Sequence, residues 1–272
     1  MPGRRFCSHN LNPCNLFPRP TLLACPGEFL WGLVVSGDFT TLATTDSTFF
    51  ALSTAQERGS YRNFTELAIG FTAIMLVLWL PTRDQLIFGP IALLAPLVLV
   101  LAQRPTRDEL GLGLRGLIRS LWILPSAVAL TYASVFVAQR LGTFHPLYSA
   151  DLAHVGGYVL WTIYQQFLLQ DYFMPRLTRA LSSNAAIALA AVLFAAAHLP
   201  NLSLTLATLV WGAVSCWLFR RYRSLFVLGL TQGLLGLCFA VCVPDVMHHH
   251  MRVGLGYLNY HAVQATAMQA GQ

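Results

Sequence analysis

Long apolar stretches follow one another along the chain from residue 65 to residue 243, separated by short segments that contain Arg, Pro, Gly or Asp. A helix rises about 1.5 Å per residue and the hydrocarbon core of a bilayer is about 30 Å thick, so about 20 apolar residues can cross it. The pattern predicts seven such helices, of which the fifth is short enough to be tilted or partly re-entrant. Their expected ranges are 65–81, 86–102, 118–138, 153–175, 184–199, 203–219 and 225–243.

The segments outside these helices divide the chain into four expected parts. Residues 1–64 contain scattered Pro, Cys, Thr and Ser and one apolar run that is too short to span a bilayer. They are interpreted as a poorly defined N-terminal arm, a signal-like segment or translated upstream sequence. Residues 65–104 are expected to hold the N-terminal transmembrane helices, 105–243 the transmembrane core and 244–272 a C-terminal tail.

Composition supports the membrane assignment. The chain is 56% hydrophobic and 10% charged, whereas a soluble domain carries about 25% charged residues. The same figures exclude disordered, fibrous and disulfide-scaffold classes. The six cysteines include no C-x-x-C pair and are expected to be reduced. We therefore predict an integral, multipass, all-α membrane protein in contact with membrane lipids.

Positive charge indicates the orientation of the helices. All 17 basic residues are arginines, and they lie singly or in short groups between the apolar runs, which argues against a nucleic-acid partner. With seven spans, the N-terminus and alternate loops collect fourteen arginines, whereas the opposite side holds Arg83, Arg140 and Arg252. This bias predicts a cytoplasmic N-terminus and an external C-terminus.

The fourth predicted span carries an unusual group of polar side chains. Gln166 and Gln170 are four residues apart and share one helix face, and Gln165 lies about 100° around from Gln166. Asp171 follows directly. Polar side chains within a membrane are costly and often functional. The glutamines therefore form either a functional hydrogen-bonding patch or a structural contact between helices, worth about 0.6–2 kcal/mol for each bond.

A histidine lies near the end of the fifth span, in the segment FAAAHLPN. His198 stands four residues after Phe194, and small residues between them permit close approach of another helix. At 1.5 Å per residue, Gln165 and His198 reach a similar depth from opposite directions. We therefore expect the two to meet, although a packed histidine bonded to a backbone carbonyl is the alternative.

The order of these features resembles the CPBP family, also called Abi, of CAAX prenyl endopeptidases and bacteriocin-processing enzymes. Its motifs are E-E-x-x-x-R-G, F-x-x-x-H and H-x-x-x-N on a helical membrane core. In this chain they fall on QQFLLQDYFMPRL, FAAAHLPN and SLFVLGLTQGLLG. RPTRDELGLGLRGL is similar to the amphipathic segment that precedes the family core. The resemblance covers about residues 105–240, is strongest at 158–236, and implies a CPBP-like core within residues 105–243.

The motif chemistry differs from the family pattern at most positions. Only Phe194 and His198 are unchanged. The two glutamates fall on Gln165 and Gln166, the arginine on Gln170, the glycine on Asp171, and the histidine and asparagine of the third motif on Gln232 and Gly236.

In the family, the glutamate and the histidines are thought to activate water for peptide hydrolysis, with or without a metal. A carboxamide cannot accept that proton at neutral pH, and losing a general base typically costs about 10²–10⁴ in rate. One histidine with amides is a poor zinc site, so the cofactor stays undefined. We therefore expect impaired proteolysis. Loss of the arginine together with the glutamates also avoids an unpaired buried cation.

Two further groups carry alternative interpretations. Asp171 either lies at the cytoplasmic end of its span, solvated or paired with Arg176, or exchanges protons together with His198. The run His248 to His250, near Asp245, either binds a divalent metal or is structural. The structural interpretation is favoured, because consecutive helical residues point 100° apart.

Three functional hypotheses follow. The first is a protease-impaired CPBP protein that binds a prenylated or transmembrane peptide partner in the former substrate cavity. The second is an enzyme that acts on an isoprenoid or lipid, with Asp171 and His198 as acid and base. The third is a structural subunit or chaperone of a membrane complex. Candidate site residues are Gln165, Gln166, Gln170, Asp171, His198 and Gln232.

Overall fold

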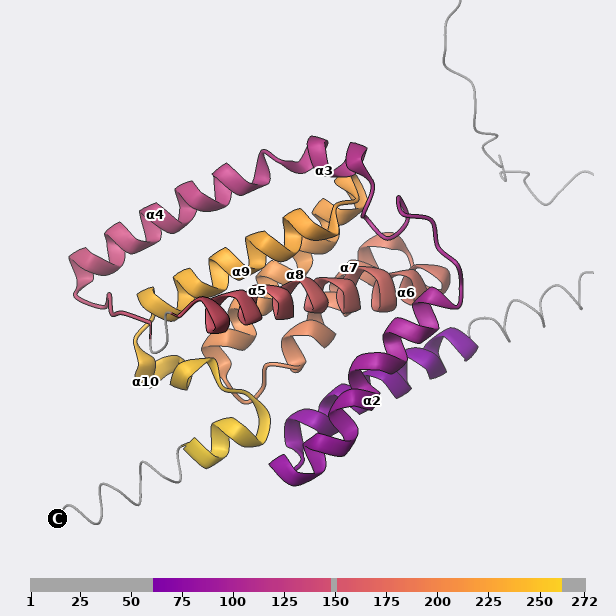
Figure 1. The fold of residues 1–272 in the computed structure, drawn as a ribbon, viewed down its shortest axis with the longest axis horizontal. Coiled ribbons are helices and arrows are strands. Elements are labelled where there is room, and N and C mark those ends of the chain that lie inside the picture. The colour runs from indigo at the N-terminus through magenta and orange to yellow at the C-terminus, as the bar shows by residue number, and fades with distance from the viewer. Residues whose placement is uncertain (1–60, 148–150, 261–272) are drawn as a thin grey trace, which may run out of the picture. The chain divides into compact units, whose positions relative to one another are not determined.

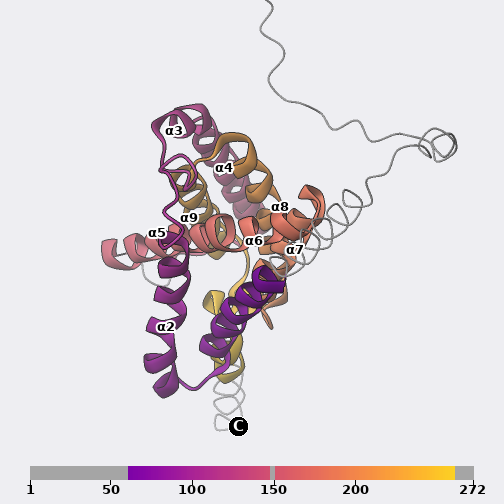
Figure 2. The same ribbon diagram turned by 90° about the vertical axis from the view of Figure 1, so that its right-hand side faces the viewer.

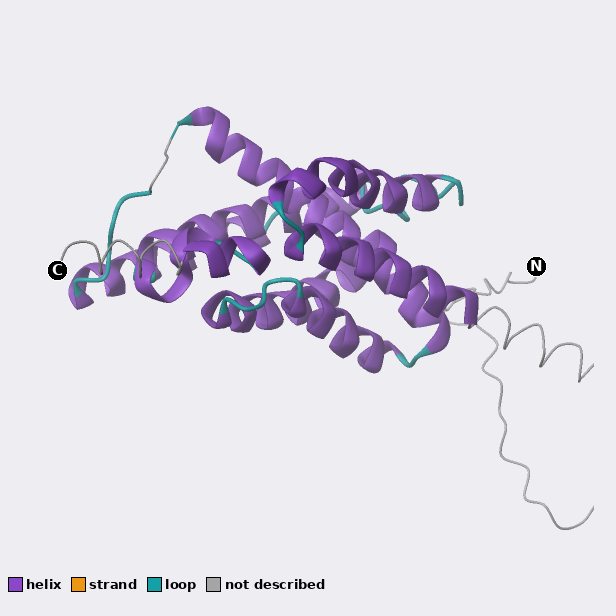
Figure 3. Ribbon diagram, turned by 90° about the horizontal axis from the view of Figure 1, so that it is seen from below, coloured by secondary structure: helices purple, strands orange, loops and turns teal. Residues whose placement is uncertain are grey.

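The structure is a computed structural model, and it describes residues 61–147 and 151–260. The predicted N-terminal arm lies almost entirely outside the described residues, as does the end of the C-terminal tail. Within the described residues the secondary structure is helical and contains no strand (Figure 3). This confirms the all-α prediction.

The helices begin and end close to the predicted apolar ranges (Figure 1). Residues 61–79 form the first described helix, and residues 254–260 are helical at the other end of the described chain. Between them lie α2 (Thr82–Leu101), α3 (Leu114–Ser120), α4 (Ile123–Leu141), α5 (Leu152–Phe167), the π-helical turn η1 (Leu168–Phe173), α6 (Met174–Ala180), α7 (Ser183–Ala196), α8 (Leu202–Tyr222), α9 (Leu225–Cys242), α10 (Asp245–His248) and the 3-10 turn η2 (His249–Met251).

Four helical segments of the described chain are long and apolar enough to cross a membrane: Thr82–Leu101, Leu114–Leu141, Leu202–Tyr222 and Leu225–Cys242. Leu86 and Tyr132 expose 75% and 76% of their surface on two of these segments, as expected for side chains that face lipid. The predicted count of seven is not confirmed. The fourth predicted range carries the polar residues and is divided among α5, η1 and α6, and α7 has only 14 residues.

Small residues let the central helices approach each other closely. A Cβ added at Gly229 of α9 would lie 2.7 Å from the Cα of Ile163 in α5. At the same contact, the Thr162 hydroxyl donates to the Gly229 carbonyl over 2.9 Å. On the neighbouring pair, a Cβ at Gly212 of α8 would lie 3.1 Å from the Cα of Ala191 in α7. These contacts place α5 against α9 and α7 against α8.

The arginine-rich segments gather at one end of the bundle. The Leu225 amide, at the start of α9, donates to the Gly111 carbonyl over 2.9 Å. Arg179 of α6 donates to Gln103, just beyond α2, over 3.3 Å. At the opposite end the His145 amide donates to the Val241 carbonyl over 3.0 Å. The segments around Gln103, Gly111, Arg179 and Leu225 therefore lie at one end of the bundle, and those around His145 and Val241 lie at the other. Which end faces the cytoplasm remains a prediction.

The helix over residues 61–79 and α2 form an antiparallel hairpin that stands beside α5 and η1 (Figure 2). The Tyr164 hydroxyl donates to the Leu93 carbonyl of α2 over 2.6 Å, and the Tyr172 hydroxyl donates to the Glu66 carbonyl over 2.6 Å. This hairpin thus closes one wall of the space in front of the glutamines.

Candidate functional site

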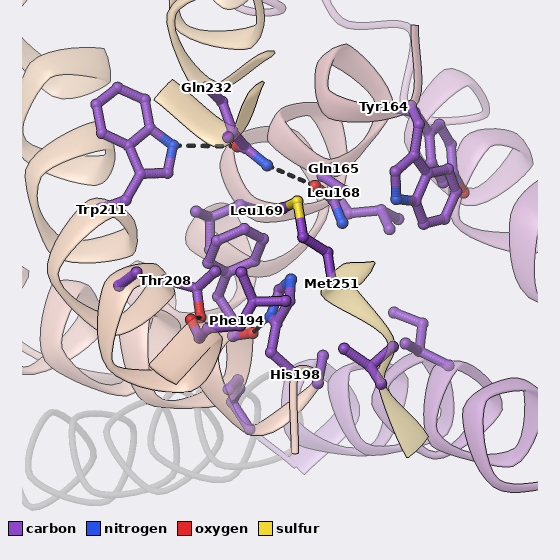
Figure 4. A pocket seen from close by; sticks show the side chains of 18 of the residues that line it. Tyr164, Gln165, Leu168, Leu169, Phe194, His198, Thr208, Trp211, Gln232 and Met251 are labelled. Carbon is purple, nitrogen blue, oxygen red and sulfur yellow. Dashed lines mark hydrogen bonds between the residues drawn. The ribbon is translucent and has the colours of Figure 1, made fainter. Parts of the chain in front are cut away.

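Four glutamines at the motif positions form one chain of hydrogen bonds. Gln170 Nε2 donates to Gln166 Oε1 over 3.1 Å, and Gln166 Nε2 donates to Gln232 Oε1 over 2.6 Å. Gln232 Nε2 then donates to Gln165 Oε1 over 2.5 Å (Figure 4). Gln166 is completely buried and Gln170 is 2% exposed. The predicted neutral patch on α5 is therefore joined to the third motif on α9.

Trp211 of α8 fixes the direction of this chain. Its indole Nε1 donates to Gln232 Oε1 over 3.1 Å (Figure 4). An indole nitrogen can only donate, so Gln232 must keep its oxygen at this position. Reversing the whole chain would place the Gln232 amino group against the indole donor. Gln165 consequently accepts from Gln232 through its oxygen, and its amino group remains for other partners.

A large cavity of about 740 Å³ lies in front of Gln165 and Gln232. Its walls are mainly aliphatic and aromatic side chains from the 61–79 helix, α2, α5, α7, α8 and α9. His198 is the only Asp, Glu, His, Cys, Lys or Arg among the described residues that line it. Besides Gln165, His198 and Gln232, the lining residues with polar N or O atoms in their side chains are Tyr158, Trp161, Tyr164, Thr208 and Trp211.

His198 lies in the turn that follows α7, and it is 9% exposed. Its Nδ1 lies 2.8 Å from the Phe194 carbonyl oxygen, so Nδ1 carries the proton and donates it. Nε2 of the neutral ring is then an acceptor. Gln165 and His198 line the same cavity, in agreement with the depth argument, and the described structure gives no hydrogen bond between them.

Asn201 and Trp211 are two site residues that sequence reasoning missed. Asn201 caps α8, because its Oδ1 accepts from the Leu204 amide over 3.2 Å. Its Nδ2 donates to the carbonyls of His248 and Arg252 over 2.7 and 3.1 Å. Asn201 thereby attaches the His198 turn to the segment after α9. An Asn directly before an apolar run is a sequence signal for a helix cap, and Asn201 carries this signal. The sequence around Trp211 contains no comparable signal for its hydrogen bond to Gln232.

Asp171 lies apart from the cavity that contains His198. It is 7% exposed and lines a second cavity together with Gln170. Arg176, one of the partners considered for Asp171, pairs instead with Glu66, whose Oε2 lies 2.9 Å from Arg176 Nη2. Asp171 lies in the π-helical turn η1 and Arg176 follows in α6, so the two side chains point in different directions. Arg176 consequently faces the 61–79 helix, whereas Asp171 faces the end of α8.

The three consecutive histidines turn toward different partners. Nε2 of His248 lies 3.0 Å from the Val243 carbonyl oxygen, and its Nδ1 accepts from the Met251 amide over 3.2 Å. Nδ1 of His250 lies 3.0 Å from Asp245 Oδ1. His248 is thus held as part of the turn after α9, which matches the structural interpretation of this run.

The residues at the motif positions do not fit a zinc ion. A zinc site requires three or four imidazole, thiolate or carboxylate ligands, whereas these positions offer one imidazole and amides that are bonded to one another. No group of three or more His, Cys, Asp or Glu side chains with metal-binding geometry occurs within residues 61–147 and 151–260. The chemistry available at this cavity is therefore hydrogen bonding and a single imidazole base.

Comparison with known families agrees with the motif resemblance. Residues 152–238 match the family model described as type II CAAX prenyl endopeptidase Rce1-like. This range runs from the start of α5 to within α9 and includes the four hydrogen-bonded glutamines of the site as well as His198. No match is found among curated proteins or solved structures. Residues 152–238 of this membrane protein are therefore similar to the Rce1-like family model, in agreement with the CPBP resemblance of the motifs.

Proposed function

We propose that this protein binds a lipidated or membrane-embedded partner in the large apolar cavity and does not hydrolyse peptide bonds at the rate of its family. One observation carries the proposal. The motif positions that hold acid, base and cation in the family are amides here, and they are bonded to one another. The large cavity therefore has amides where the family motif places its pair of carboxylates.

The bonding of Gln166 argues against a catalytic role. Its oxygen accepts from Gln170 and its nitrogen donates to Gln232, so the amide is engaged on both sides. An amide oxygen also has no useful basicity at neutral pH. His198 Nε2 is the remaining base at the cavity. A lone base without its partner is expected to lose about 10²–10⁴ in rate.

The cavity supports a ligand with a long apolar part and a neutral polar group. Its volume of about 740 Å³ falls in the range of sites for small molecules and cofactors. Its polar end offers the Gln165 amino group as a donor and His198 Nε2 as an acceptor. A prenylated peptide, a transmembrane peptide or an isoprenoid combines these properties.

The test of activity uses detergent-purified wild type and His198→Ala side by side. Cleavage of a quenched prenyl-CAAX peptide is measured together with the metal content of both proteins. We expect no cleavage above background in either protein. Cleavage by the wild type that is lost in His198→Ala would refute the proposal, because amides would then be able to serve in place of the carboxylates.

The test of binding compares two substitutions on the same helix. Ala207→Phe places a large side chain in the cavity, whereas Leu206→Phe alters the adjacent exposed position outside it. We expect a fluorescent farnesylated peptide to bind wild type and Leu206→Phe equally and Ala207→Phe at least tenfold more weakly. Equal binding by all three proteins would place the ligand elsewhere.

The position of Asp171 argues against the alternative of an isoprenoid enzyme with Asp171 and His198 as acid and base. The two residues line different cavities. Asp171→Asn keeps the size of the side chain and is expected to leave ligand binding in the large cavity unchanged. Loss of product formation in this variant, with binding intact, would instead favour the enzyme hypothesis.

A further inference from the structure

A second cavity of about 440 Å³ lies at the arginine-rich end of the bundle. Its wall is made from the end of α2, the turn that follows it, the η1–α6 region and the end of α8. Three arginines and two acidic residues contribute to this wall: Arg179, Arg220, Arg223, Glu109 and Asp171. The cavity is separate from the proposed site of the lipidated partner, and its function does not depend on that proposal.

The three arginines of this cavity make no ion pair within 4.0 Å in the described structure, although Arg223 is close enough to Glu109 and Asp171 to attract both carboxyl groups. Arg179 donates to the neutral amide oxygens of Asn63 and Gln103, each over 3.3 Å. Arg223 lies over the Phe219 ring, 5.2 Å from its centroid. The basic residues that do make ion pairs shorter than 4.0 Å within the described residues lie elsewhere, and they are Arg62, His154, Arg176, His248 and His250.

The two carboxyl groups leave an excess of positive charge. The Glu109 carboxylate already accepts from the amide and the hydroxyl of Thr106, over 2.7 and 3.0 Å. Asp171 is 93% buried, and its Oδ2 has no hydrogen-bond partner in the described structure. Three guanidinium groups against two carboxyl groups give the cavity a net positive charge even when both acids are ionised.

The cavity also lies where two helices that can span a membrane end. It adjoins the ends of α2 and α8, the apolar segments Thr82–Leu101 and Leu202–Tyr222 that can span the membrane. At the ends of both helices the apolar sequence stops and the arginines begin. Such a change in sequence is typical of the boundary between the hydrocarbon core and the lipid headgroups. Part of the cavity wall remains apolar, through Val100, Met174 and Phe219, which suits the first carbons of an acyl chain.

We propose that the second cavity binds the phosphate group of an anionic phospholipid through Arg179, Arg220 and Arg223. Guanidinium groups recognise phosphate oxygens through paired charge-assisted hydrogen bonds. The excess of positive charge favours an anionic headgroup over a zwitterionic one, whose own cation the arginines would repel. The buried position of Asp171 keeps its carboxyl at the inner wall, beyond the exposed arginine side chains.

The experiment uses the full-length protein after delipidation in a neutral detergent. Bound lipid is counted by native mass spectrometry during titration with dioleoyl-phosphatidylglycerol, with dioleoyl-phosphatidylcholine in parallel. Arg220→Gln and Arg179→Gln each remove one guanidinium from the cavity. Arg221→Gln is the matched control, because Arg221 is exposed beside Arg220 on α8 but does not line the cavity.

We expect one phosphatidylglycerol to bind more tightly than phosphatidylcholine. Arg220→Gln or Arg179→Gln should weaken this binding about tenfold, whereas Arg221→Gln should leave it unchanged. Arg220→Lys, which keeps the charge, should recover part of the affinity and shows that the change acts through charge rather than folding. An equal loss in Arg221→Gln would overturn the proposal, because the effect would be general surface charge. An Arg220-dependent thermal stabilisation by inorganic phosphate as large as that by phosphatidylglycerol would overturn the lipid assignment.

Discussion

The substitution Gln166→Glu tests whether the donor and acceptor roles in the series of glutamine hydrogen bonds are fixed, as the geometry indicates. It replaces one buried amino group with an oxygen and changes the side-chain volume very little. The native Nε2 donates to Gln232 Oε1 over 2.6 Å, so an ionised carboxylate would set two oxygens against each other. Gln232 cannot turn its amide around to donate instead, because Trp211 donates to the same oxygen.

The introduced carboxyl is therefore expected to stay protonated and to donate its O–H to Gln232. The reference pKa of glutamate is about 4.3, so holding the group neutral at pH 7 costs about 3.7 kcal/mol, at 1.36 kcal/mol per pH unit. At pH 5 the same cost is about 1 kcal/mol. For a protein of this size, 1 kcal/mol changes the melting temperature by about 2–4 °C. We expect Gln166→Glu to lower the melting temperature by about 7–15 °C at pH 7 and by about 2–4 °C at pH 5.

The assay is thermal unfolding in detergent, followed by tryptophan fluorescence at both pH values. The control is Gln139→Glu, the same chemical change at an exposed position near the end of α4. The reasoning is refuted if Gln166→Glu is as stable as wild type at pH 7. It is also refuted if the loss is the same at both pH values, since the carboxyl would then not be held neutral by burial.

Addition of Gln170→Arg tests whether the family's charge pair can be rebuilt. Gln170 Nε2 already lies 3.1 Å from Gln166 Oε1, so a guanidinium at this position would reach the introduced carboxylate. Gln170→Arg alone is expected to destabilise by about 3–5 kcal/mol, because it buries an unpaired cation. Together with Gln166→Glu it should recover about 1–3 kcal/mol, measured as the coupling free energy of a double-mutant cycle. A coupling free energy near zero would contradict this.

Three further changes are expected to act through single contacts. Trp211→Phe removes the donor to Gln232 and should destabilise by about 1 kcal/mol in thermal unfolding; an unchanged melting temperature would remove the indole from the chain. Arg176→Gln removes a buried partner of Glu66 and should destabilise the protein by about 1–3 kcal/mol. Arg62→Gln removes an 82% exposed partner of the same Glu66 and should change the stability by less than about 1 kcal/mol. Equal effects of the two substitutions would show that burial of the arginine does not matter. Burial lowers the pKa of His248 below its usual 6.5, so the unfolded chain binds more protons. Stability should therefore fall as the pH drops below about 6.5, and a melting temperature that stays flat from pH 8 to pH 5 would refute this.

The positions of the helices could be predicted because they depend on local pattern. Each predicted apolar range overlaps a helix, since length and hydrophobicity are properties of the segment itself. The shared face of Gln166 and Gln170 followed from helix periodicity, and the common depth of Gln165 and His198 followed from the rise per residue. Their placement on one cavity agrees with both arguments.

The remaining contacts depend on partners far away in the sequence. Arg176 pairs with Glu66, which lies 110 residues earlier, and this pairing removed the expected partner of Asp171. The π-helical turn at 168–173 redirects the side chains that follow it, and no simple sequence pattern marks such a turn. Trp211 reaches Gln232 only because α8 packs beside α9. These contacts become visible only in the folded structure.

The direction of the hydrogen bonds explains how the departures from the family motif are coupled. Gln170, Gln166 and Gln232 each donate an amino group to the oxygen of the next glutamine, the series ends at Gln165, and the Trp211 indole sets its direction. Returning Gln166 to glutamate reverses one bond, and returning Gln170 to arginine introduces a cation without a partner. The acceptor left over is Gln170 Oε1, which is buried without a hydrogen-bond partner in the described structure. Restoring the glutamate at position 166 or the arginine at position 170 alone is therefore expected to give a protein that is less stable than one with the present neutral series of amides.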